Sequence, residues 1–187
     1  MALSKDQYIY IEETILDTYE AAGVSTFPID VFDLCKKLKI SVRKYSEYPA
    51  KLIDYSDDAF RIFNPKKQEF IIVYNDSIES NRVNFSIMHE IGHIQLDHQR
   101  RKLSESEQEN EANSFAQKAL APVGVILRLE LKTDIQISSV FNISLPCARI
   151  ITNNLRFIIQ RPSLCQKEIN NPITALFEEE ICAYINK

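Results

Sequence analysis

The segment from Phe85 to His93 restricts most strongly what this chain can fold into. It reads Phe-Ser-Ile-Met-His-Glu-Ile-Gly-His and contains the pattern His-Glu-x-x-His, in which His89, Glu90 and His93 are the polar members. Apolar residues surround these three on nearly every side, which predicts a buried helix from about 80 to 97. Burying two imidazoles and a carboxylate without partners is costly, so the fold must supply partners for them.

The spacing of the two histidines suits a metal ion. Residues four apart lie on one face of an α-helix, so His89 and His93 can present both imidazoles to one Zn²⁺. A zinc hydrolase also needs a carboxylate near the metal to take a proton from water, and Glu90 lies beside the pair. The alternative is that both histidines are structural and that Glu90 is solvated or pairs along the helix. The predicted helical context favours zinc.

A third ligand is needed, because a catalytic zinc site usually has three protein ligands. The next predicted helix, residues 105–120, begins with a capping box formed by Ser104 and Glu107. Relative to the centre of its apolar face, Glu109 lies at about 60°, Glu111 at about 100° and Glu107 at about 140°. We therefore expect Glu109 to be the third ligand and Glu107 and Glu111 to be solvated. The alternative for Glu109 is a solvated charge at a helix start, which the helix dipole favours.

Two more polar residues lie close to the expected site. Asn113 follows Glu109 by one turn on the same helical face, where its side chain can orient a ligating histidine. His98, the third histidine of the chain, breaks the four-residue spacing. We expect it at the surface near the end of its helix.

The other elements predict an α+β fold. Apolar periodicity predicts a helix over residues 4–22, and Pro28 is expected in the first turn of a second helix. Runs rich in Ile, Val, Phe and Tyr predict short strands. These runs cover residues 40–45, about 51–55, 59–63 and 69–74. Because helices follow the strands instead of alternating with them, the pattern indicates a small, antiparallel-rich sheet with segregated helices.

The chain after Pro122 is predicted to be helical. Shorter helical pieces are expected over residues 124–160, and one last amphipathic helix is expected near 173–185. We therefore divide the chain into a core, residues 1–122, and a helical C-terminal extension, residues 123–187.

Residues 133–157 within this extension have the outline of a helix-turn-helix, with Ser144 as the N-cap of the second helix. Only Arg149 and Arg156 add positive charge to that helix. A DNA-binding surface is usually basic, so DNA binding is not expected, and the segment is predicted to pack on the core or to dock a partner.

Composition is that of an ordinary globular protein. The chain has 26 acidic and 22 basic residues, and its formal net charge of −4 argues against broad nucleic-acid binding. The start of the chain has no apolar signal segment, and its apolar runs are far shorter than a membrane helix. The four cysteines are widely spaced and contain no Cys-x-x-Cys pair. Disulfides would be expected only in a secreted chain, so we expect these thiols to be reduced. We expect a cytoplasmic protein that does not associate with membranes.

In combination, these motifs resemble the ImmA/IrrE family of zinc metallopeptidases. The resemblance rests on the runs His89–His98, Glu109–Ala116 and Leu120–Pro122. The family shows a His-Glu-x-Gly-His helix, a Glu-Ala-Asn-x-Phe-Ala helix and a closing Leu-x-Pro. This chain has Leu-Ala-Pro where Leu-Met-Pro is usual, a change that touches no expected site residue.

The resemblance implies a thermolysin-like core with Zn²⁺ as the cofactor. In the family the third ligand is the Glu four residues before the Asn or Asp of the second helix, which corresponds here to Glu109 before Asn113. Family members include anti-repressors of mobile elements, which act on helix-turn-helix repressors, and a bacterial radiation-response protease.

We therefore expect a zinc endopeptidase that cleaves a protein substrate, with a helix-turn-helix transcriptional repressor as the expected substrate. Glu90 is the expected catalytic residue, because it can accept a proton from water and pass it to the leaving amine. An extended substrate is expected to add to the edge of the sheet at the 69–74 strand. The alternative is a non-catalytic zinc-containing module that regulates transcription by binding a repressor or DNA.

Overall fold

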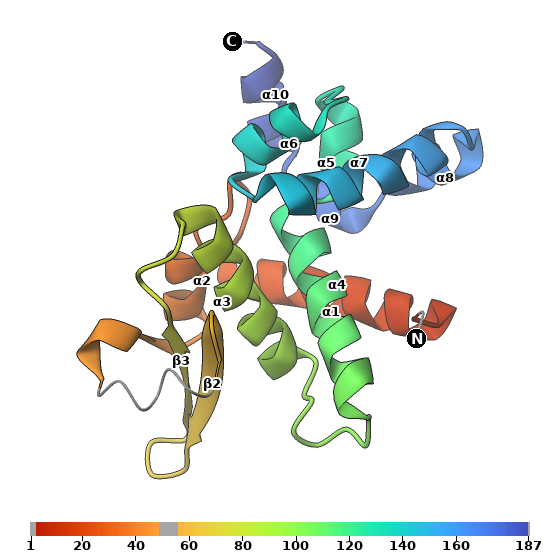
Figure 1. Ribbon diagram of the computed structural model, residues 1–187. Helices are drawn as coiled ribbons and strands as arrows, with labels where there is room; N and C mark the ends of the chain where they lie inside the picture. Colours follow the sequence, from red (N-terminus) through yellow and green to blue (C-terminus); the bar gives the residue numbers. More distant parts are fainter. Residues whose placement is uncertain (1–2, 49–55, 187) are drawn as a thin grey trace.

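The computed structural model describes residues 3–48 and 56–186 and has an α+β fold, as predicted (Figure 1). The strand expected near 51–55 lies outside the described residues. The elements occur in this order along the chain: α1 (Lys5–Ala22), α2 (Val31–Lys37), β1 (Ser41–Lys44), the 3-10 turn η1 (Tyr45–Glu47), β2 (Ala59–Asn64), β3 (Glu69–Tyr74), α3 (Ser80–Gln95), α4 (Glu105–Leu120), α5 (Val123–Arg128), α6 (Asp134–Phe141), α7 (Leu145–Ile159), α8 (Pro162–Ile169), α9 (Pro172–Ala175) and α10 (Glu178–Ile185).

The sheet has three strands in the order β1-β3-β2. β1 runs parallel to β3, with Ser41 opposite Ile71, and β2 runs antiparallel to β3, with Ala59 opposite Tyr74. The sheet is therefore mixed, and β3 is its central strand. The prediction that the 69–74 strand offers a free edge is wrong, because β1 and β2 pair with both of its sides. Among the described strands, the outer edges belong to β1 and β2.

Helices α3 and α4 pack closely against each other, and α3 also contacts β2 and β3 (Figure 1). Small residues allow this approach: an ideal Cβ on Gly92 would lie only 3.0–3.2 Å from side-chain atoms of Phe115. Ala112 and Ala116 are fully buried on α4, next to Phe115. The two helices that carry the expected site are thus held at short range by the core of the protein.

Local sequence signals account for most helix boundaries. The Ser104 hydroxyl accepts a hydrogen bond from the Glu107 amide, so the predicted capping box starts α4. Asp30 caps α2 through the amides of Phe32 and Asp33. Pro28 therefore precedes α2 instead of lying in its first turn, because the aspartate cap sets a later start.

The C-terminal helices include the predicted helix-turn-helix outline. α6 ends at Phe141 and is capped by Asn142, which has a positive φ of 49°, and the Ser144 hydroxyl caps α7. The single helix expected near 173–185 is instead divided into α9 and α10, since Phe177 leaves the helical conformation between them. The division of the chain at residue 122 stays a prediction. None of the helices in the described ranges is long and apolar enough to cross a membrane.

A stability prediction arises at Gly124 in α5. A methyl group there would overlap the hydroxyl of Thr174 and the backbone carbonyl of Glu168. We expect Gly124→Ala to lower the free energy of unfolding by about 1–3 kcal/mol, because overpacking against backbone cannot be relieved by a rotamer change. The comparison variant is Gly92→Ala, whose added methyl would meet side-chain atoms of Phe115 at 3.0–3.2 Å instead of backbone, so its loss of stability should be smaller than that of Gly124→Ala. Equal losses for both variants in urea denaturation would contradict the prediction.

Candidate metal centre

Three predicted ligands meet between α3 and α4. His89 and His93 are one helical turn apart, and their Nε2 atoms are 3.0 Å from each other. The Glu109 carboxylate comes from α4, with one oxygen 3.3 Å from Nε2 of His89 and the other 3.1 Å from Nε2 of His93. Ligand atoms bound to a tetrahedral Zn²⁺ are about 3.3 Å apart, given bond lengths of about 2.0–2.1 Å. The spacing and the His-His-Glu donor set therefore fit zinc.

The protonation states of this group also suit a metal. Burial lowers the pKa of His93 to about 3, and the nearby Arg61 and His89 act in the same direction. The short contact with Nε2 of His89 lowers the pKa of Glu109 to about 2. At neutral pH, His93 is therefore neutral and Glu109 is ionised, and these are the forms that bind metal ions.

Asn113 lies where the sequence predicts it, one turn after Glu109. Its Oδ1 is 3.1 Å from Nδ1 of His89. Since an amide oxygen is an acceptor, Nδ1 of His89 carries the hydrogen and Nε2 keeps its lone pair toward Glu109 and His93. This contact can hold the imidazole in the orientation that a metal ligand needs.

Glu90 is buried beside the three ligand side chains and contacts a residue that sequence reasoning missed. Its Oε2 accepts a hydrogen bond of 3.0 Å from the guanidinium of Arg61 on β2. Burial raises the pKa of Glu90 above its ordinary value, while His89 and Arg61 act in the opposite direction. The signal for Arg61 was available, because it is a lone charge within the apolar run Ala-Phe-Arg-Ile-Phe.

A cleft of about 490 Å³ opens onto the site. It lies between β2, α3 and α4, and Asp58 and Arg82 form an ion pair of 2.7 Å at its wall. The lining residues are Ser56, Asp57, Asp58, Ala59, Phe60, Arg82, Phe85, Ser86, His89, Glu90, Glu109 and Asn113. The cleft thus brings Glu90 and two of the three ligand residues to one accessible surface.

The predictions for His98 and Glu111 are wrong, because both side chains are buried. His98 is 2% exposed and Glu111 is 0% exposed. α3 ends at Gln95, and Asp97 then takes a positive φ of 52°. The chain therefore turns back, which places Nδ1 of His98 2.8 Å from Nδ1 of His93. Helical spacing could not predict this contact, since His98 lies beyond the end of the helix.

Glu111 lies at the centre of a second set of contacts. Its carboxylate lies 3.0 Å from Nε2 of His98. It also accepts a hydrogen bond of 3.0 Å from the guanidinium of Arg101 and one of 2.8 Å from the side-chain amide of Gln7 on α1. Burial acts to raise its pKa, but the hydrogen bonds from Arg101, His98 and Gln7 together leave the pKa below its ordinary value. The helical wheel placed Glu111 to the side of the apolar face, and α1 and the 96–101 segment cover that side.

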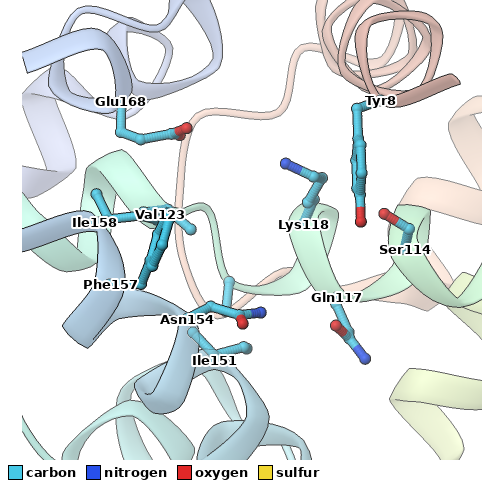
Figure 2. Close-up of a pocket in the computed structure, with 11 residues that line it drawn as sticks. Tyr8, Ser114, Gln117, Lys118, Val123, Ile151, Asn154, Phe157, Ile158 and Glu168 are labelled. Atoms are coloured by element: carbon cyan, nitrogen blue, oxygen red, sulfur yellow. The ribbon is translucent and has the colours of Figure 1, made fainter. Parts of the chain in front are cut away.

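A second cavity, of about 400 Å³, lies between α1, α4, α7 and α8. Figure 2 shows the Glu168 carboxylate and the Lys118 ammonium on opposite sides of this space, with Phe157 and Ile158 on its wall. Lys118 is already paired with Glu12 at 2.6 Å. No histidine lines this cavity, so it does not provide the His-His-Glu chemistry found between α3 and α4.

Comparison with known proteins agrees with the motifs. The family model described as the IrrE N-terminal-like domain, a peptidase family, matches residues 35–149. This range is more than half of the chain and contains β1 to β3, α3 and α4. No curated protein matches the chain significantly. The chain belongs to the peptidase family of the IrrE N-terminal-like domain.

Proposed function

We propose that this protein is a zinc-dependent endopeptidase. The observation that carries the proposal is the convergence of His89, His93 and Glu109, whose ligand atoms all lie within 4.8 Å of one another, beside the buried carboxylate of Glu90. Two imidazoles and one carboxylate are a known ligand set of catalytic zinc, and this set leaves a coordination position for water or substrate. Membership of a peptidase family supports the reaction type.

The side chains of the site have separable roles in the proposed reaction. A bound Zn²⁺ would supply a Lewis acid that lowers the pKa of water and polarises a carbonyl. Glu90 accepts a proton from the attacking water and donates it to the nitrogen of the leaving amine. Its burial favours this exchange, because the raised pKa brings the carboxylate closer to the pKa of an efficient proton carrier. Asn113 keeps His89 in its ligating orientation.

The cleft favours an extended peptide as the substrate. β2 forms an outer edge of the described sheet, and Ala59 at its start lines the cleft next to Glu90. An extended segment can pair with such an edge through main-chain hydrogen bonds. The edge that binds substrate is therefore assigned to β2 in place of the 69–74 strand. This mode requires a flexible or unfolded segment in the protein that is cleaved.

A helix-turn-helix transcriptional repressor is the proposed natural substrate, in an anti-repressor function. The support is the ImmA/IrrE resemblance, since anti-repressors of that family act on such repressors. The test is incubation of the purified protein and Zn²⁺ with helix-turn-helix repressors encoded near its gene, followed by mass spectrometry of the fragments. We expect one or a few cuts that a chelator prevents and that added Zn²⁺ restores. Intact repressors under all conditions would contradict this substrate.

A cytoplasmic location is also proposed. Cys35, Cys147, Cys165 and Cys182 are all free thiols. Free thiols are typical of reducing compartments.

Arg61 provides a test of how Glu90 is held. We expect Arg61→Met to lower kcat/KM for peptide cleavage by about 10- to 100-fold, because Glu90 loses the guanidinium that positions it. Zinc content should not fall, since the hydrogen bond and ion pair of Arg61 go to Glu90 and its positive charge does not favour a cation beside His93 and Glu109. The comparison variant is Arg82→Met, which removes a cation from the same cleft but breaks a pair with Asp58 instead. Equal activity in Arg61→Met and the native protein would contradict this role.

A further inference from the structure

We propose that Glu111 and His98 form a hydrogen-bonded relay that orients His93 for zinc, and that Gln7 on α1 completes it. The inference deepens the proposed function, because it rests on zinc binding at the same site. It assigns a positioning role to residues that neither the motif nor the spacing of the ligands identifies. It also makes the first helix, which precedes the family match at residues 35–149, part of the metal centre.

The relay is a continuous chain of short contacts in a buried part of the protein. Glu111 lies 3.0 Å from Nε2 of His98, and Nδ1 of His98 lies 2.8 Å from Nδ1 of His93. The two imidazole rings meet edge to face, with an angle of 81° between their planes. The exposed fractions of His93, His98 and Glu111 are 2%, 2% and 0%. These three side chains are therefore shielded from bulk solvent.

Donor and acceptor rules determine where each hydrogen lies. An ionised carboxylate only accepts, so Nε2 of His98 must carry a hydrogen and donate it to Glu111. In neutral His98, Nδ1 is then an acceptor, so Nδ1 of His93 must carry the hydrogen that joins the two rings. The lone pair of His93 is thereby left on Nε2, which is the atom that faces Glu109 and His89. Each link thus selects the tautomer of the next.

Glu111 is held in the position and charge state that the relay needs. Arg101 donates to both of its oxygens, and the Gln7 amide donates to Oε1 at 2.8 Å. The Gln7 side chain is itself fixed, because its oxygen accepts from the Ser4 amide in the capping box of α1. A carboxylate that is hydrogen-bonded to a ligating histidine increases the basicity of the imidazole and fixes the orientation of the ring. Removing such a partner typically lowers metal affinity by about 10- to 100-fold.

The first measurement is zinc affinity by competition with a chromophoric chelator, without any peptide substrate. We expect His98→Phe to weaken zinc binding by about 10- to 100-fold. Glu111→Gln should weaken zinc binding less, because its amide oxygen can still accept a hydrogen bond from His98. Some loss is still expected, since the amide carries no negative charge. Gln7→Ala should also weaken binding, since Glu111 loses a donor. The control is Glu107→Gln, a change on the same helix that touches no relay atom.

The second measurement keeps the inference testable if a buried variant fails to fold. Histidine ¹⁵N NMR of the native, metal-free protein should show hydrogen on Nε2 of His98 and on Nδ1 of His93. Hydrogen on Nδ1 of His98 would overturn the relay. So would zinc affinities of folded His98→Phe and Glu111→Gln that stay within twofold of the native value. Weakened zinc binding in a protein that cleaves no peptide would support the relay while rejecting the endopeptidase function.

Discussion

Glu90→Gln should abolish peptide cleavage while leaving zinc bound. The amide is nearly the same size as the carboxylate but cannot accept a proton, so the general base is lost and the cleft is kept. Removing a general acid-base group typically costs about 10²- to 10⁴-fold in rate. We therefore expect kcat/KM to fall by at least about 100-fold, measured by the cleavage of a fluorogenic peptide. Zinc content, measured by inductively coupled plasma mass spectrometry, should match that of the native protein, since the three ligand side chains are untouched.

The Glu90→Gln variant also distinguishes the endopeptidase from the alternative, a non-catalytic regulatory module. Glu105→Gln is the matched control, because Glu105 is an exposed residue at the start of α4. It should keep full activity and full zinc content. If Glu90→Gln cleaves peptide at the native rate, the proposed catalytic role is wrong. If it cleaves nothing but still relieves repression in cells, the regulatory-module hypothesis is favoured over the endopeptidase.

Glu109→Ala should weaken zinc binding more than any change outside the ligand set. The substitution removes the only expected ligand from α4 and leaves His89 and His93 alone on α3. We expect the affinity to fall by more than about 100-fold, which is the upper range for residues that only support a ligand. Chelator competition measures the loss directly. The fold should persist, because the Glu109 side chain is half exposed and contributes little to the core.

Two comparisons make the Glu109 prediction specific. Glu105→Ala removes an exposed acidic residue from the same helix and should bind zinc as tightly as the native protein. Glu111→Gln should lie between the two, because the relay supports His93 without contacting the metal. A ranking in which Glu111→Gln loses more zinc affinity than Glu109→Ala would contradict the assignment of the third ligand.

Features that depend on neighbours along the chain were predictable. The observed bounds of α4 agree with the predicted 105–120 helix, because its capping box and apolar periodicity are local signals. The His89–His93 pair also needs only one helix, which imposes the four-residue spacing. Predicting Glu109 as a ligand required a second helix, α4. The direction of its side chain nevertheless followed from the helical wheel once the apolar face of that helix was known.

Features that depend on how elements meet could not be predicted in the same way. β3 looked like a possible edge strand, and only the parallel pairing with β1 makes it central. Arg61 contacts Glu90 because β2 lies beside α3, although 29 residues separate the two positions in sequence. Strand pairing and helix docking depend on contacts between distant residues, about which local periodicity carries no information.

The sequence by itself determined the ligand-bearing helix, the His-Glu-x-x-His geometry and the side of α4 from which Glu109 points. These features need only the periodicity of one helix at a time. Tertiary structure alone decided the surroundings of the ligands. The turn at Asp97 brings His98 back to His93, and α1 brings Gln7 to Glu111 across 104 residues of sequence. The physical reason is burial: a charge such as Glu111 can be interior only when partners from distant segments satisfy it.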